Sequence, residues 1–426
     1  MKEIKLKGLE QSVYTETLNN GLDIYLVPFE NKKNYFISYA TKFGSEVVEF
    51  TDNNKKTFKP PLGIAHFLEH KMFENDDGID PFTFFSESGT DSNASTSFDH
   101  TQYICSGTKK FRENLRYLLK FVNSPYYTDE NVNKEKVIIA EEINMYQDIP
   151  DYKLEMKIRE EVYTNIPRSI DIAGTVEEIN KITKEDLYSC YNNFYKTNNM
   201  FVLVVGNFKL SDAIEVIKEE LDKKETTEVA TIKDVKETIS VREKEIILKE
   251  NVEVPKLAFA LKIPTKKLSL SDVELDLYLS ILSNILFGAS SEFRERCRVN
   301  KLLNGIYTEW ETIKDFKTLY ILATTLDPDK LLDEIKYELK NLSITEKTFE
   351  RIKKVWIANE VKMIDNIDST VNNIFDDIIR YNRIIQDRVD IIRNMNLKVL
   401  EKLIKEIDFK NTSVVKMINK NNKEIQ

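Results

Sequence analysis

The pattern of apolar and polar positions in the first half of the chain predicts strands mixed with helices. Residues 22–28 and 35–43 alternate or run apolar, and Asn19-Asn20-Gly21 supplies a turn before them, so both stretches are predicted strands. Pro60-Pro61 then precedes a short helix at 64–73, where proline costs little because the first N–H groups of a helix lack partners. The same reasoning predicts strands at 93–98, 101–106 and 200–205 and helices at 111–122, 129–148, 186–195 and 211–222.

The second half of the chain repeats this mixture in outline. Its predicted strands are 244–248, 257–263, 319–324 and 413–417, and its predicted helices are 272–287, 328–342 and 346–380. Two halves of similar make-up favour an ancient duplication that survives in the order of elements. The stretch between the halves is polar and unpatterned. We therefore predict an α+β fold of two domains, 1–222 and 239–426, joined by a linker at 223–238.

Composition narrows the class of protein. Hydrophobic residues make up 41% of the 426 positions, enough to bury sizeable cores, and the net charge of −9 argues against nucleic acid or an anionic membrane as the main partner. We find no apolar run of the length that a signal peptide or a membrane span needs. Three scattered cysteines argue against a disulfide framework or a cysteine-based zinc site. These features predict a cytoplasmic protein.

Two of the three histidines stand in the sequence His66-Phe67-Leu68-Glu69-His70. On a helix, residues four apart lie one turn apart on the same face, so both imidazoles can reach a single ion. Glu69 flanks that face and is placed to hold a water rather than the metal. A catalytic zinc site has three protein ligands, commonly imidazole or carboxylate, and one open position. The spacing therefore predicts a catalytic zinc site on this helix.

The alternative for this helix is structural. It would pack into the core through its apolar residues, which are Ile64, Phe67, Leu68 and Met72, with both histidines satisfied there. Histidine is so rare in this chain that its occurrence twice at metal-binding spacing, beside Glu69, favours the zinc site.

The third ligand is expected to be acidic, because His100, the remaining histidine, stands in a short turn between predicted strands. Glu135 and Glu142 lie seven residues apart on one face of the helix predicted at 129–148. That face also carries apolar residues expected to be buried: Val132, Ile138, Ile139, Met145 and Tyr146. A carboxylate on a buried face is costly unless it binds something, so Glu142 is the predicted ligand and Glu135 a support for a histidine or the water. Glu141 points about 100° away and is expected to be solvated; alternatively, all three acids lie on a solvated face.

Several segments together resemble a known family. HxxEH is the inverted zincin motif. Combined with the downstream segment from Glu135 to Glu142, and with Gly89-Thr90-Asp91-Ser92-Asn93-Ala94-Ser95-Thr96 through Tyr103 between them, it resembles the pitrilysin/insulinase (M16) zinc metallopeptidases. HFLEHKMFE followed by EEINMYQDIPDY is especially similar to bacterial cytosolic half-length members. The resemblance implies two homologous domains, each a mostly antiparallel sheet packed with helices, as in mitochondrial processing peptidase and LuxS-like metallohydrolases.

Carried over to this chain, the resemblance implies that His66, His70 and Glu142 bind one zinc ion, with Glu69 as general base and Glu135 as the supporting carboxylate. The strand at 93–98 would be the edge onto which an extended peptide adds through backbone hydrogen bonds. Its substrate-binding residues would be Asn93, Ala94, Ser95 and Thr96. The alternative for this strand is an ordinary sheet edge.

In its second half the family often places an arginine and a tyrosine that hold the substrate and its oxyanion. The segment from Ser290 through Arg298 to Tyr307 is similar to that region, so Arg298 and Tyr307 take these roles. The match departs from the family pattern, because Val299 and Asn300 follow the arginine and the spacing to the tyrosine is longer than usual. Arg294 or Arg296 could hold the substrate instead of Arg298. A further alternative is that all three are ordinary surface arginines.

The family's activity implies a zinc endopeptidase that cleaves short unfolded peptides in a chamber formed by two subunits. Members of twice this length carry four such domains, so this chain would pair with itself or with a related M16 chain. One rival is a non-catalytic or conditionally active subunit of a heteromeric peptidase or peptide-maturation complex, although this chain keeps all the zinc residues. The interpretation that zinc is purely structural has less support, because structural zinc sites usually have four protein ligands and only three are found in this sequence.

Overall fold

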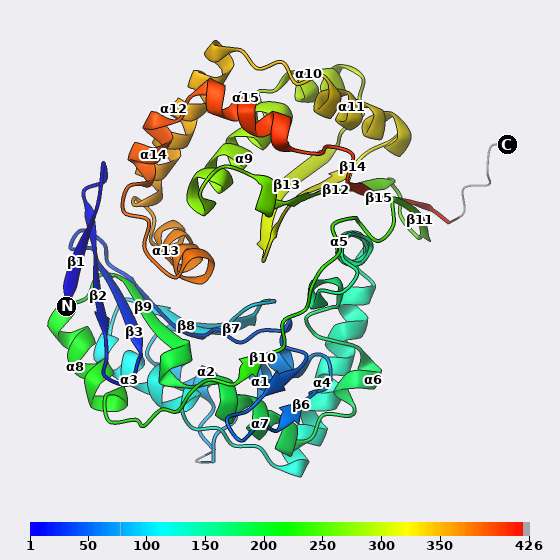
Figure 1. Ribbon diagram of the computed structural model, residues 1–426. Helices are drawn as coiled ribbons and strands as arrows, with labels where there is room; N and C mark the ends of the chain where they lie inside the picture. Colours follow the sequence, from blue (N-terminus) through cyan, green and yellow to red (C-terminus); the bar gives the residue numbers. More distant parts are fainter. Residues whose placement is uncertain (77, 421–426) are drawn as a thin grey trace. The chain divides into compact units, whose positions relative to one another are not determined.

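The computed structural model describes residues 1–76 and 78–420, and their contacts divide the chain into two compact units (Figure 1). Unit 1 is Met1–Met145, Asp171–Asp234 and Val361–Asp387. Unit 2 is Tyr146–Ile170, Val235–Glu360 and the chain from Arg388 onward. Each unit is built around one mixed sheet.

The sheet of unit 1 has seven strands in the order β1-β2-β3-β9-β4-β8-β7. They are β1 (Lys2–Leu6), β2 (Gln11–Thr17), β3 (Asp23–Pro28), β9 (Met200–Gly206), β4 (Tyr35–Thr41), β8 (Thr101–Gly107) and β7 (Asp91–Thr96). All neighbouring strands are antiparallel except β3 and β9, which are parallel. The central strand β9 is fully buried, whereas β7 lies at the edge of the sheet. A second small sheet in unit 1 joins β10 (Thr231–Ile232), β5 (Phe50–Thr51) and β6 (Thr57–Phe58).

The helices of unit 1 cover both faces of its main sheet. They are α1 (Ile64–Lys71), α2 (Pro81–Glu87), α3 (Phe111–Val122), α4 (Asp129–Gln147, whose last turn passes into unit 2), α6 (Val176–Ile179), α7 (Lys184–Phe194), α8 (Leu210–Leu221) and α13 (Ile367–Tyr381). One core joins α1, α3, α4, α7 and α8 to the inward side chains of the strands. A second core packs α13, from the far end of the sequence, against residues of β9 such as Phe201 and Leu203.

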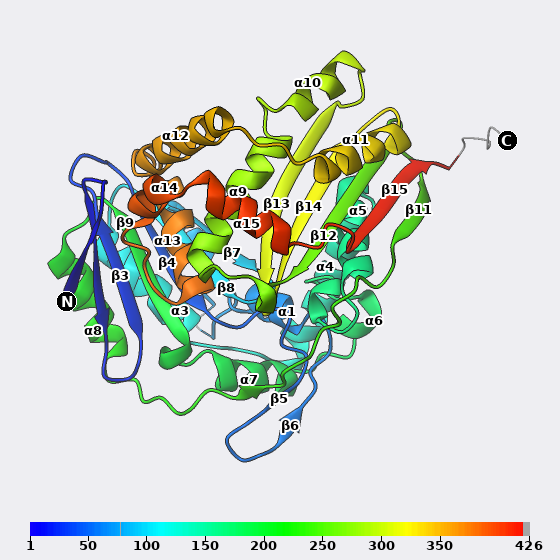
Figure 2. The same cartoon turned by 45° about the horizontal axis from the view of Figure 1, so that its top comes forward.

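The sheet of unit 2 has five strands in the order β11-β15-β12-β14-β13. They are β11 (Glu245–Glu250), β15 (Thr412–Asn419), β12 (Lys256–Pro264), β14 (Phe316–Thr324) and β13 (Gly305–Ile313). α5 (Pro150–Val162) packs on β12 and β15. The other helices of the unit, seen in Figure 2, are α9 (Asp272–Phe287), α10 (Glu292–Val299), α11 (Pro328–Lys340), α12 (Glu346–Met363), α14 (Arg388–Asn394) and α15 (Leu397–Glu406).

The two sheets share one topology, which confirms the predicted α+β fold and the duplication. In unit 1 the order β3-β9-β4-β8-β7 pairs the first two strands in parallel and the rest antiparallel. In unit 2 the order β11-β15-β12-β14-β13 follows the same pattern, and corresponding strands occur in the same sequence along the chain. By this correspondence, the edge strand β7 matches β13.

The units differ in two segments from the domains expected at 1–222 and 239–426. Residues 146–170, which include α5, belong to unit 2, and residues 361–387, which include α13, belong to unit 1. Each repeat thus contributes one helix that covers the other repeat's sheet. A local pattern shows that a helix has an apolar face but does not show which sheet buries that face.

The helix predicted at 346–380 is two helices, α12 and α13. The break falls at Asn366, whose side chain accepts a hydrogen bond from the N–H of Ser369 and begins α13.

By length and composition alone, one described stretch, Asp272–Val299, is apolar enough to cross a membrane, with a mean hydropathy of 1.2. It is interrupted between α9 and α10, and 56% of its apolar window is buried, as in a core helix. The three cysteines are buried free thiols.

Candidate metal and catalytic site

Helix α1 is anchored in the core of unit 1 by one face. Gly63, directly before the helix, has a φ of 84°, and a Cβ at this position would lie 2.2 Å from the carbonyl oxygen of Ala173, so only glycine fits. The apolar residues Ile64, Phe67 and Leu68 are buried, as the structural alternative expected. The two histidines do not find their polar partners within that core, because their half-buried rings face α4 instead.

Two histidines and one glutamate from these two helices converge. The Oε2 atom of Glu142 lies 3.4 Å from Nε2 of His70 and 3.8 Å from Nε2 of His66. The ring centroids of the histidines are 4.6 Å apart, and one ligand atom from each of the three residues fits within 4.8 Å of the others. The predicted ligand set is therefore brought together, although α1 and α4 lie about sixty residues apart along the chain.

The donor set fits a zinc ion. It consists of two imidazole nitrogens and one carboxylate oxygen, the ligands of catalytic zinc sites that keep one position open. Among the described residues the buried Nδ1 atom of His66 has no hydrogen-bond partner. His70 has the hydrogen bond at its second ring nitrogen that commonly orients a metal-binding histidine, whereas His66 does not.

The surroundings pull the pKa values of the two histidines apart. Burial, and then the nearby charge of His70, lower the pKa of His66 to about 4. Burial also acts to lower the pKa of His70, but hydrogen bonds with Glu135 and Glu142 outweigh it and raise that pKa to about 9. The hydrogen bond with His70 in turn lowers the pKa of Glu142. The lowered pKa favours the neutral form of His66, and the raised pKa favours the protonated form of His70, with whose proton a metal would compete.

Glu135 orients one of the two histidines. Its Oε1 lies 3.0 Å from Nδ1 of His70, and the side chain is almost fully buried. Burial would raise the pKa of Glu135, but the hydrogen bond and charge of His70 lower it. With Nδ1 held by this carboxylate, Nε2 of His70 points toward Glu142. Glu135 thus lies in contact with a predicted ligand, and its supporting role stays a prediction.

Glu69 lies beside the histidine pair and makes a contact that the sequence pattern did not predict. Thr96, at the end of β7, donates a hydrogen bond of 2.6 Å to Oε2 of Glu69. Burial raises the pKa of Glu69, and the hydrogen bond from Thr96 partly opposes that rise. The residue is 9% exposed. The position of Thr96 follows from the docking of α1 against β7, which no local signal reveals.

The prediction of a uniformly buried face on α4 was wrong in part. Val132 and Ile139 are buried, but Ile138, Met145 and Tyr146 are 45%, 55% and 37% exposed. Ile138 and Met145 lie on one side of Glu142 and the buried Val132 and Ile139 on the other, so Glu142 stands at the boundary. Tyr146 lies on the buried side but next to the end of the helix.

The other acid and histidine weighed for the metal lie elsewhere in unit 1. Glu141 is exposed, as predicted from its angle. His100 is engaged with Asp99, 2.7 Å from its Nδ1, and its ring packs against Phe375. Neither belongs to the metal-ligand cluster.

The predicted peptide-binding strand is a true sheet edge. β7 pairs with β8 on one side only, and Asn93, Ala94, Ser95 and Thr96 all lie within it. Its other side carries backbone N–H and C=O groups that have no strand partner in the sheet.

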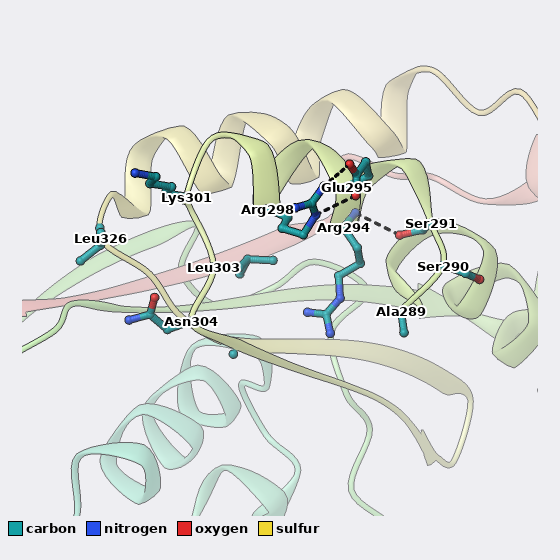
Figure 3. Close-up of a pocket in the computed structure, with 11 residues that line it drawn as sticks. Ala289, Ser290, Ser291, Arg294, Glu295, Arg298, Lys301, Leu303, Asn304 and Leu326 are labelled. Atoms are coloured by element: carbon teal, nitrogen blue, oxygen red, sulfur yellow. Dashed lines mark hydrogen bonds and ion pairs between the residues drawn. The ribbon is translucent and has the colours of Figure 1, made fainter.

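Arg298 and Tyr307 lie in unit 2. Arg298 is exposed and forms two hydrogen bonds with Glu295, of 2.9 and 2.6 Å, and Tyr307 stands exposed on β13. Arg298, Arg294 and Lys301 line an open cavity of about 750 Å³ beside α10 (Figure 3). In Figure 3 the guanidinium group of Arg294 points away from Glu295. Arg296, the other alternative, pairs with Glu334 and Glu338 of α11.

Comparison with known proteins places this arrangement in a family. A family model described as insulinase (peptidase family M16) matches residues 59–176, and one described as peptidase M16 inactive domain matches residues 181–355. The protein named uncharacterized zinc protease YmfH of Bacillus subtilis (strain 168) is 35% identical over 413 residues, which cover 95% of this chain and 96% of that protein. The chain belongs to the M16 peptidase family. All the metal-cluster residues fall in the part that the insulinase model matches.

Two solved structures share the fold. An M16-like peptidase from Alicyclobacillus acidocaldarius superposes with a TM-score of 0.91 at 31% identity, covering 97% of this chain and 100% of that one. The periplasmic protease PqqL from Escherichia coli matches with a TM-score of 0.77 at 18% identity, covering 96% of this chain but only 47% of PqqL. This M16 chain thus has the size of the first protein and about half that of the second.

Proposed function

We propose that this M16 protein is a zinc-dependent endopeptidase that hydrolyses short unfolded peptides. The observation that carries the proposal is the convergence of His66, His70 and Glu142, with the buried carboxylate of Glu69 beside them. His66, His70 and Glu142 would hold the ion, one per chain. When bound, zinc supplies Lewis-acid polarisation of the scissile carbonyl and acidifies a water.

Glu69 is the proton carrier in this proposal. Burial raises its pKa, which makes the carboxylate a stronger base than an exposed glutamate while Thr96 holds one of its oxygens. Its other oxygen takes the proton of the attacking water as the water oxygen bonds to the peptide carbonyl carbon. Glu69 then delivers that proton to the leaving amine as the C–N bond breaks.

Edge strand β7 is proposed to hold the substrate. An extended peptide adds to the free side of β7, and Thr96, at its end, is hydrogen-bonded to Glu69. Binding through backbone groups reads conformation rather than side-chain sequence, so unfolded peptides are the expected substrates. Arg298 and Tyr307 are the proposed partners of the substrate and its oxyanion in unit 2.

Two chains are proposed to form the working enzyme. This chain matches about half of PqqL, and family members of double length support a pairing with a second copy or with a related M16 chain. The second candidate function is a non-catalytic or conditionally active subunit of such a pair. The match of residues 181–355 to a domain described as inactive favours it for that part of the chain.

A quenched fluorescent peptide library and metal analysis test the proposal. Glu69→Gln is expected to keep stoichiometric zinc and to lower kcat by at least about a hundredfold, because the proton acceptor is lost. Glu142→Gln is expected to lose zinc, whereas the control Glu141→Gln, next to it and exposed, keeps both zinc and activity.

If the wild-type protein binds no zinc and cleaves no peptide, the proposed peptidase activity is refuted. Cleavage that appears only after a related chain is added would favour the conditional subunit, and zinc binding without cleavage under any pairing would favour the non-catalytic one.

A further inference from the structure

Lys71, the last residue of α1, is a buried cation next to the metal cluster. Its side chain is 0% exposed, and its Nζ lies 2.7 Å from Oε2 of Glu74 and 3.9 Å from Oε2 of Glu135. The residue follows His70 directly. Removing an ammonium group from water is costly, and pairing with carboxylates repays the cost only in part.

A fold that needed only packing at this position would gain more from an apolar side chain. Replacing a buried ion pair by well-packed hydrophobic residues of similar volume is often neutral or stabilising. Packing alone therefore does not account for a lysine at this position, and the groups that it faces indicate another role. Glu135 uses one oxygen, Oε1, for His70 and presents the other, Oε2, toward Lys71.

We propose that Lys71 is a positioning residue for the metal centre. Among the described residues Nζ makes no hydrogen bond, so it acts on Glu135 through its charge at 3.9 Å. Its attraction for Oε2 favours the orientation in which Oε1 stays on Nδ1 of His70 and Nε2 of His70 stays turned toward Glu142. Glu74 holds Lys71 from the other side, so a chain of contacts runs from Glu74 through Lys71 and Glu135 to His70. The inference rests on the proposed function in one respect, which is that the cluster binds zinc.

The charges of the cluster support this role. Glu135 and Glu142 contact His70, Glu69 acts on its charge, and Glu74 pairs with Lys71, the fully buried amine of this group. Without Lys71, the cations left near Glu135 are His70 and the exposed Lys134, so less positive charge would keep Oε2 turned away from His70. Partners that orient a metal-bound histidine commonly change metal affinity by 10- to 100-fold when lost.

The test compares Lys71→Met with Lys134→Met. Lys134 precedes Glu135 and lies 4.0 Å from the same Glu74, but its side chain is 71% exposed, so it matches Lys71 in charge and neighbourhood but not in burial. Zinc affinity is measured by competition with a chelator, the ligand geometry by the absorption spectrum of the cobalt form, and the folding of metal-free protein by thermal unfolding.

We expect Lys71→Met to weaken zinc binding about 10- to 100-fold and to alter the cobalt spectrum. The metal-free protein is expected to lose some stability, because Glu135 stays buried with one cation fewer. Lys134→Met should stay within about twofold of wild type. Lys71→Arg, which keeps the charge, should restore most of the affinity. If Lys71→Met does not fold, Lys71→Gln replaces it in the same measurements.

Wild-type affinity and spectrum in Lys71→Met would overturn the inference, as would equal losses in the methionine and arginine variants, which would indicate packing. These results are distinct from failure of the proposed function, in which the wild-type protein itself binds no zinc.

Discussion

At the scale of single residues, the hydrogen bond between Thr96 and Glu69 controls how easily the proposed base is protonated. Burial raises the pKa of Glu69, and the hydroxyl group of Thr96 works against that rise by donating to the carboxylate. The base must be ionised to accept a proton from water. Loss of the hydroxyl should therefore move the acidic limb of the kcat/KM–pH profile to higher pH.

Thr96→Val tests the direction in which the acidic limb moves. The valine keeps the shape of the side chain but cannot donate, so we expect the acidic limb to shift upward and kcat at neutral pH to fall about fivefold, the worth of a hydrogen bond of ~1 kcal/mol. Thr96→Ser keeps the hydroxyl and should retain the wild-type profile. An acidic limb that moves down, or not at all, in Thr96→Val would show that the contact does not tune the base.

The sequence predicted which residues the structure brings together at the candidate metal site. His66, Glu69 and His70 follow from the periodicity of one helix, and Glu142 follows from sharing a face with Glu135 on another. Thr96 was expected only as part of a peptide-binding strand. Lys71 gave no signal at all, because a lysine at a helix end is usually solvated and its burial depends on how α1 packs.

At the scale of elements, the free edge of β7 predicts how substrates respond to changes in their backbone. If a peptide adds to this edge, N-methylation of a peptide nitrogen that bonds to β7 removes one ladder hydrogen bond. Each such change should lower kcat/KM about fivefold, and methylation at the peptide terminus should have no effect. A complete N-methyl scan in which no position matters would argue against strand addition.

A buried ion pair between Glu237 and Lys262 stabilises the start of the second repeat in unit 2. Glu237 accepts hydrogen bonds from Nζ of Lys262, at 2.9 Å, and from the N–H groups of Thr164, Asn165 and Ile166. Burial acts to raise the pKa of Glu237, but these contacts outweigh it and lower the pKa to about 2 from an ordinary value of 4.5. The ionised form thus stabilises the fold above pH 4.5, and this contribution disappears as the pH falls from 4.5 to 2.

Glu237→Gln should lower the free energy of unfolding by about 3 kcal/mol at pH 7, because it leaves Lys262 buried without its counter-ion. The difference from wild type should shrink as the pH falls through the same window. Denaturant unfolding at several pH values measures it, with the exposed Glu253→Gln as control. A difference that stays constant with pH would contradict the role of the ionised carboxylate.

Element boundaries were predicted where the pattern is local. The helix at 272–287 matches α9 to the residue, and the strand predicted at 200–205 is β9, whose seven positions are all buried. The hairpin of β1 and β2 and the strand β13 were missed, because their half-buried faces do not alternate cleanly. The exposed apolar residues of α4 show that an apolar stripe in the sequence does not reveal whether another element covers it.

At the scale of the whole molecule, the proposed pairing makes activity depend on protein concentration. If two chains build the working site, dilution below the dissociation constant should lower the specific activity per chain without changing the zinc content per chain. Sedimentation velocity should show dimers giving way to monomers over the same range. Constant specific activity in samples that sediment as monomers would refute the two-chain enzyme.

The helices α5 and α13 carry a consequence for how this polypeptide can be divided. A fragment cut after Asp234 would keep α5 without the sheet that buries it, and its own large sheet would lack α13. Neither piece would be soluble by itself, yet the two co-expressed would complement each other as a split protein. For the same reason, a founding gene that encoded a single repeat would have yielded stable product only as two intertwined copies, long before fusion joined them into one reading frame.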